Sequence, residues 1–60
     1  MSKIKKLRIL NEITQERLAE MVGVSQSYLS LLERNKVAIP EELDKKFEAV
    51  FKESFEIIDT

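Results

Sequence analysis

The stretch MVGVSQSYLS, residues 21–30, decides the fold, because it contains the only glycine of the 60-residue chain. Apolar residues stand on both sides of Gly23, and Ser25, Gln26 and Ser27 follow with hydrogen-bonding groups that carry no charge. Glycine adopts the left-handed backbone conformation without a Cβ penalty, so Gly23 is expected to end a helix. The Ser25 hydroxyl can accept a hydrogen bond from a free amide of the following turn. We therefore expect Ser25 to cap the start of a second helix.

The two helices on either side of Gly23 have further signals at their outer ends. Thr14 is expected to cap the first of them, which then runs to about Val22. The second is predicted to run from Gln26 to about Arg34, where Asn35 is the next residue that tolerates the left-handed region. Both helices are short, and their apolar residues recur at three- and four-residue spacing.

The connection between these helices spans only about three residues, which suits two short helices that meet at a steep angle. Such an angle requires a small residue where the helices touch, and Ala19 lies one turn before Gly23. The residues expected to point inward are Leu18, Val22, Val24, Leu29 and Leu32. Those left facing outward are Gln15, Gln26, Ser27, Ser30 and Leu31. The start of the second helix is therefore expected to be presented to solvent.

The rest of the chain is also helical in pattern. A helix is predicted from about Ser2 to Asn11, and Pro40 suits the first turn of a later helix, because the amide that proline lacks would be unpaired there. The buried stripe of this later helix is expected to be Leu43, Phe47, Val50 and Phe51. Ser54 is expected to cap a last short turn. No strand pattern, repeat or linker interrupts residues 1–60, so the predicted fold is one all-α, compact domain of four to five helices.

Composition excludes most catalytic chemistry. The chain has no cysteine and no histidine, so the commonest metal ligands, the commonest general base and a thiol nucleophile are all missing. We expect neither an enzyme nor a metal or other cofactor. No run approaches the roughly 18 apolar residues of a membrane span, and the N-terminus lacks the apolar segment of a signal peptide. The expected location is the cytoplasm, without a membrane partner.

Charge is unevenly distributed along the chain. Residues 1–37 carry seven basic and four acidic side chains, a net charge of +3, whereas residues 38–60 carry three and seven, a net charge of −4. The first part can face an anion and the second cannot. Ordinary solvated helix faces explain the same pattern.

The stretch TQERLAEMVGVSQSYLSLLERNK, residues 14–36, resembles the helix-turn-helix of the phage repressor and Cro family, which includes the Xre-type bacterial regulators. The positions that carry the resemblance are Gln15, Ala19, Gly23, Val24 and Leu29. The helices predicted before and after this stretch fit the five-helix domain of the family. The sequence departs from the family pattern at Asn35, where a glycine is usual, and at Leu31, where a polar or basic residue is usual.

The resemblance implies sequence-specific binding to a double-stranded DNA operator by a small transcriptional regulator of repressor type. Residues 26–34 would then be a recognition helix in the major groove. The candidate base-contacting residues are Gln26, Ser27 and Leu31. Gln26 can pair bidentately with adenine, and Leu31 can offer a methyl surface to thymine. In the family, the glutamine at the place of Gln15 touches a phosphate and hydrogen-bonds to the recognition-helix glutamine, which would orient Gln26.

Each of these residues also has a reading without DNA. Gln26, Ser27 and Ser30 are compatible with an ordinary exposed helix face, and Leu31 with packing under a loop or in a protein interface. Tyr28 is expected to cover the core with its ring and to offer its hydroxyl to a phosphate.

Basic residues are expected to contact phosphates without reading sequence. Arg34 and Lys36 follow the recognition helix, and Lys5 and Lys6 can add to them from the first helix. The candidate backbone-contacting or supporting residues are Gln15, Tyr28, Ser30, Arg34 and Lys36. The family commonly pairs an arginine at the place of Arg8 with a glutamate at the place of Glu33, so the resemblance implies a structural ion pair between these two residues.

Regulators of this kind usually bind as two-fold dimers on paired half-sites. The apolar residues Phe51, Phe55, Ile57 and Ile58 make a homodimer plausible, although they can equally complete the core of the domain itself. A rival function remains open as well, namely a protein-interaction module that has kept the helix-turn-helix fold but lost its affinity for DNA. The acidic balance and Leu31 favour this rival.

Overall fold

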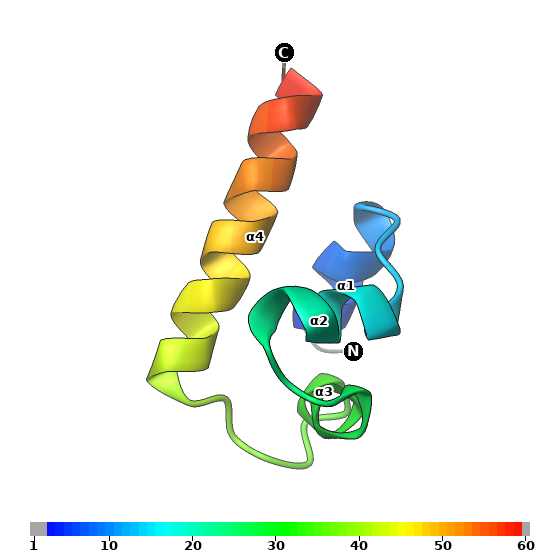
Figure 1. Cartoon of the computed structure of the whole chain (residues 1–60), viewed down its shortest axis with the longest axis vertical. Helices are drawn as coiled ribbons and strands as arrows, with labels where there is room; N and C mark the ends of the chain where they lie inside the picture. Colours follow the sequence, from blue (N-terminus) through cyan, green and yellow to red (C-terminus); the bar gives the residue numbers. More distant parts are fainter. Residues whose placement is uncertain (1–2, 60) are drawn as a thin grey trace.

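The computed structural model describes the backbone of residues 3–59 and the side chains of residues 3–52. Over these residues the chain forms four helices and no strand: α1 (Lys3–Leu10), α2 (Gln15–Val22), α3 (Gln26–Glu33) and α4 (Glu41–Asp59). The predicted all-α class is confirmed. In Figure 1 the three short helices gather beside the lower part of α4, whose last turns extend past them.

The corner between α2 and α3 forms as the sequence predicts. Gly23 has φ 74° and ψ 34°, the left-handed conformation. The Gly23 amide donates to the Glu20 carbonyl over 3.3 Å, and the Val24 amide donates to the Ala19 carbonyl over 2.9 Å. These two bonds satisfy the last carbonyls of α2, as in a Schellman motif. A Cβ at Gly23 would meet nothing within 4 Å, so the positive φ alone explains the glycine.

Both predicted N-caps are confirmed. The Thr14 hydroxyl accepts from the Arg17 amide over 3.1 Å at the start of α2. The Ser25 hydroxyl accepts from the Tyr28 amide over 3.1 Å at the start of α3. Because each cap satisfies one free donor of a first turn, the starts of the two helices are fixed, at Gln15 and at Gln26.

Two further helix ends use a left-handed residue that is not glycine. Asn35 has φ 59°, as predicted, and ends α3, which stops at Glu33, one residue before the expected end. Glu12 has φ 55° and follows α1, and this left-handed residue was not predicted from the sequence. The Ile13 amide then donates to the Arg8 carbonyl over 3.0 Å, which reverses the chain between α1 and α2.

The core draws on all four helices. Its buried hydrophobic residues are Ile4, Leu18, Ala19, Val22, Leu29, Leu32, Leu43, Phe47 and Phe51. The partly buried residues packed against it are Leu7, Ile13, Val24, Tyr28 and Val50. The buried stripe predicted for the last helix is therefore confirmed at three positions, while Val50 lies at the margin of the core.

Three predicted boundaries differ from the structure. Helix α4 continues through Ser54 to Asp59, so the separate last turn capped by Ser54 was wrong. No glycine or proline interrupts that segment, and serine is tolerated inside a helix. The Pro40 carbonyl accepts from the Asp44 amide over 2.9 Å, which places Pro40 at the cap of α4 and not in its first turn. Helix α1 ends at Leu10, although the Asn11 amide still donates to the Leu7 carbonyl over 3.0 Å.

No helix in the described part of the chain is both long enough and apolar enough to cross a membrane.

Candidate nucleic-acid interface

An open groove runs between the start of α2 and the outer face of α3. The residues that line it are Gln15, Gln26, Ser27, Ser30, Leu31 and Arg34. The first five are the residues that the sequence places on the outer face, and the structure brings them together in one surface. Gln26 and Ser27 are exposed, whereas Gln15, Ser30 and Leu31 are half-buried.

Helical periodicity explains why the groove has this lining. Ser27, Leu31 and Arg34 follow one another at spacings of four and three, so they share one face of α3. The opposite face buries Leu29 and Leu32 in the core. The buried side therefore holds α3 in place while its first turn and outer face stay clear of the protein.

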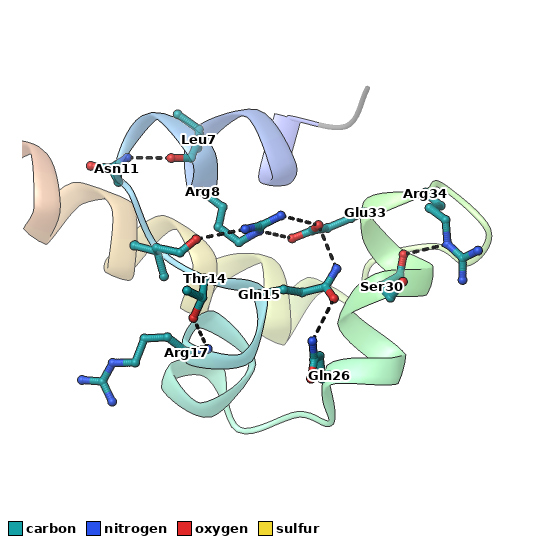
Figure 2. Close-up of polar contacts among 11 residues, drawn as sticks. Leu7, Arg8, Asn11, Thr14, Gln15, Arg17, Gln26, Ser30, Glu33 and Arg34 are labelled. Atoms are coloured by element: carbon teal, nitrogen blue, oxygen red, sulfur yellow. Dashed lines mark hydrogen bonds and ion pairs between the residues drawn. The ribbon is translucent and has the colours of Figure 1, made fainter.

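A continuous chain of hydrogen bonds leads from the interior to this groove (Figure 2). Arg8 Nε donates to Glu33 Oε2 over 2.8 Å, and Arg8 Nη2 donates to Glu33 Oε1 over 3.2 Å. Gln15 Nε2 donates to the same Glu33 Oε1 over 3.1 Å. Gln26 Nε2 in turn donates to Gln15 Oε1 over a longer distance of 3.3 Å. These hydrogen bonds connect α1, α3 and α2, and the last of them reaches Gln26, the exposed first residue of α3.

The inner end of this chain is a buried ion pair. The side chain of Glu33 is 2% exposed and that of Arg8 is 14% exposed. Arg8 Nη1 also donates to the Ile13 carbonyl over 3.0 Å, beside the turn at Glu12. A bidentate guanidinium–carboxylate pair of this kind fixes both side chains in one plane. It ties α1 to the end of α3.

At the outer end, Gln26 is oriented but not fully engaged. Its Nε2 donates to Gln15, and no hydrogen bond engages its Oε1 among the residues whose side chains the structure describes. One carbonyl oxygen and one amide proton are thus available on the groove side. A paired donor and acceptor of this spacing is what a base edge in the major groove can bind.

The structure places the residues proposed for phosphate contact in different settings. Lys36 is exposed just after α3, and Tyr28 packs its partly buried ring against the core. Arg34 lines the groove itself, and its Nε donates to the Ser30 carbonyl over 3.4 Å. The position of Arg34 beside the candidate base-contacting residues was not predicted from the sequence. The signal was present, since Arg34 lies seven residues, about two turns, after Ser27.

The apolar residues proposed for a homodimer are not equivalent. Phe51 is 3% exposed and belongs to the core of its own chain, so its assignment to a dimer surface was wrong. Phe51 is part of the buried core cluster, which is the alternative that the sequence left open. Phe55, Ile57 and Ile58 lie outside the residues whose side chains the structure describes.

Comparison with known proteins supports the architecture. A family model described as helix-turn-helix matches residues 4–58, which is nearly the whole chain. Comparisons with curated proteins and with solved structures each gave no significant match. The family is one of DNA-binding regulators and is not an enzyme family. The length of the match shows that this chain belongs to the Cro/C1 (Xre-type) helix-turn-helix family.

Proposed function

We propose that this chain binds double-stranded DNA in a sequence-specific way and acts as a small transcriptional regulator of repressor type. In this proposal residues 1–60 act as one DNA-binding unit in the cytoplasm, and α3 lies in the major groove. The observation that carries the proposal is the position of Gln26, which is exposed on the first turn of α3 and hydrogen-bonded to Gln15. An α-helix with its side chains is about 10–12 Å across, which fits a major groove about 12 Å wide.

Three residues of α3 are proposed to contact bases. Gln26 can accept from N6 of adenine and donate to N7, because it has both a free carbonyl oxygen and a second amide proton. Ser27 can donate or accept, so it discriminates less between bases. Leu31 presents only methyl groups, which suits the C5-methyl of thymine. All three line the same groove.

The surrounding polar residues are proposed to contact the phosphate backbone. Arg34 and Lys36 supply positive charge after α3, and Gln15, Tyr28 and Ser30 can donate from neutral groups. The net charge of +3 on residues 1–37 supports this side as the one that meets DNA. The acidic residues of α4 belong to the other half of the sequence.

A single α3 reaches only a few base pairs, so two copies on a two-fold symmetric operator are part of the proposal. The contact between the two copies is proposed to involve Phe55, Ile57 and Ile58. Phe51 is left out of this set because it is buried in the core of its own chain. Half-sites are then expected about one DNA turn apart.

Binding to labelled duplex DNA across a range of salt concentrations tests the proposal. We expect log affinity to fall linearly with log salt, with a slope of about −0.9 for each phosphate neutralised. We also expect Gln26→Ala to weaken binding to the preferred site by about 1–3 kcal/mol and to leave binding to random DNA nearly unchanged. Equal losses on both DNAs would refute base reading by Gln26. A chain that retains no duplex at low salt would be the protein-interaction module instead.

A further inference from the structure

We propose that Glu33 is a positioning residue that decides which base Gln26 reads, favouring adenine over guanine although Glu33 itself is too deeply buried to meet DNA. This inference rests on the proposed function, because it names the determinant of base preference at the same site. The observation behind it is the hydrogen bond from Gln15 to the Glu33 carboxylate, which connects the buried ion pair to the groove.

The first step concerns the direction of the Gln15 amide. An ionised carboxylate accepts hydrogen bonds and donates none. Glu33 Oε1 lies 3.1 Å from Gln15 Nε2, so the amide of Gln15 must turn its nitrogen inward. Its oxygen then has to point the other way, toward the groove. The charge on Glu33 therefore fixes an orientation that a glutamine side chain alone leaves open.

The second step carries this direction to Gln26. Gln15 Oε1 is a pure acceptor, and it lies 3.3 Å from Gln26 Nε2. Gln26 consequently turns its nitrogen toward Gln15. What remains for DNA is the carbonyl oxygen of Gln26 and its second amide proton, that is, one acceptor beside one donor.

The third step connects this pattern to base chemistry. Adenine presents the N6 donor and the N7 acceptor in the major groove, which matches one acceptor beside one donor. Guanine presents two acceptors, O6 and N7, so the Gln26 carbonyl would face another oxygen. If both amides were reversed, Gln26 would direct its oxygen at Gln15 and its amino group at DNA, a pattern suited to guanine. The direction in which the Gln15 and Gln26 amides point therefore decides which base Gln26 can pair with.

Burial of Glu33 fixes the inner end of the series of hydrogen bonds that runs from Glu33 through Gln15 to Gln26. Glu33 is 3% exposed, and it is the one buried charged or polar residue among the described side chains. Two hydrogen bonds from Arg8 hold its carboxylate, and a third from Arg8 to the Ile13 carbonyl holds the guanidinium. Reversal of Gln15 would put its carbonyl oxygen against this carboxylate in a region of low dielectric, where two acceptors repel strongly.

The variant Glu33→Gln tests the inference, because it keeps the shape of the side chain and removes its acceptor-only character. A neutral amide at position 33 can offer Gln15 either its oxygen or its nitrogen. The measurement uses two duplexes that differ only at the base pair whose discrimination is lost in Gln26→Ala. We expect the unchanged chain to prefer adenine over guanine there by about 5- to 150-fold. In Glu33→Gln this ratio should fall at least fivefold, toward unity.

The ratio of the two affinities distinguishes a change in the orientation of Gln26 from a loss of stability. Both affinities come from the same preparation, so any loss of folded protein cancels. The matched control is Glu16→Gln, which makes the same chemical change at an exposed position of α2 next to Gln15 and should leave the ratio unchanged. Gln15→Met keeps the ion pair between Arg8 and Glu33, but methionine has no amide that could orient Gln26. It should therefore lower the preference for adenine over guanine as Glu33→Gln does.

A second measurement applies if Glu33→Gln does not fold. In nuclear Overhauser spectra of the unaltered chain at low temperature, the side-chain amide protons of Gln15 should give cross-peaks with the guanidinium protons of Arg8, because both groups donate to the same carboxylate. If these cross-peaks are absent, the inference is overturned. A folded Glu33→Gln that keeps the full preference for adenine would also overturn it, with DNA binding intact. Failure of the unchanged chain to bind any duplex would instead refute the proposed function.

Discussion

Replacing Arg8 by Met should destabilise the fold more than any exposed substitution, because it leaves Glu33 as a buried carboxylate without its counter-ion. The side chain of Glu33 is 2% exposed, so water cannot take over from the guanidinium without opening the structure. Methionine keeps most of the length and the apolar stem of arginine, which limits the loss of packing.

Removing one partner of a buried ion pair costs about 3–5 kcal/mol, since the remaining charge stays desolvated. A chain of this size has a total stability of about 3–9 kcal/mol at the usual 0.05–0.15 kcal/mol per residue. Arg8→Met should therefore remove a large share of the free energy of unfolding. At about 4–8 °C for each kcal/mol, the melting temperature should fall by at least about 12 °C.

The assay is urea denaturation followed by circular dichroism, with Arg8→Met, Glu33→Leu and the double variant measured together. The double variant leaves no buried charge without a partner, so it should be clearly more stable than the sum of the two single losses predicts. Strictly additive losses, or a loss below about 1 kcal/mol for Arg8→Met, would contradict the description of this pair as a desolvated link between α1 and α3.

Four smaller predictions concern the turns, a cap and one base contact. Gly23→Ala should cost about 1–2 kcal/mol in the free energy of unfolding through its positive φ alone, because no atom lies within 4 Å of the added Cβ. Glu12→Gly should raise the free energy of unfolding, since Glu12 has φ 55°; a loss of stability would show that the turn after α1 is not strained. Ser25→Ala should cost about 1 kcal/mol by removing the cap of the Tyr28 amide. Thermal melting checks all three of these variants. Replacing thymine by uracil at the base pair opposite Leu31 should weaken binding of the unchanged chain and not of Leu31→Ala; equal weakening of both would argue against a methyl contact.

Local signals were sufficient to predict the helix-turn-helix from the sequence. Thr14, Ser25 and Gly23 each act on backbone groups within a few residues of their own position, so their roles can be recognised without knowledge of the rest of the fold. The same applies to Asn35, whose left-handed conformation needs only a tolerant side chain.

Features that depend on contacts between distant segments were harder to predict. The hydrogen bond from Gln15 to Glu33 joins residues 18 positions apart and depends on the crossing of α2 and α3, which no spacing rule gives. Glu12 adopts a left-handed conformation although its side chain does not favour one, because the chain must reverse between α1 and α2. Ser54 resembled a cap only because serine serves both at helix starts and, less often, inside helices.

Selection from random duplex DNA tests whether the first turn of α3 reads bases through Gln26. Run in parallel with the unchanged chain and with Gln26→Ala, it should enrich one two-fold symmetric motif that contains an adenine in each half-site, and the variant should lose its preference at that adenine while keeping the rest of the motif. If the unchanged chain enriches no motif, or if Gln26→Ala enriches the same motif with the same adenine preference, then Gln26 does not read this base.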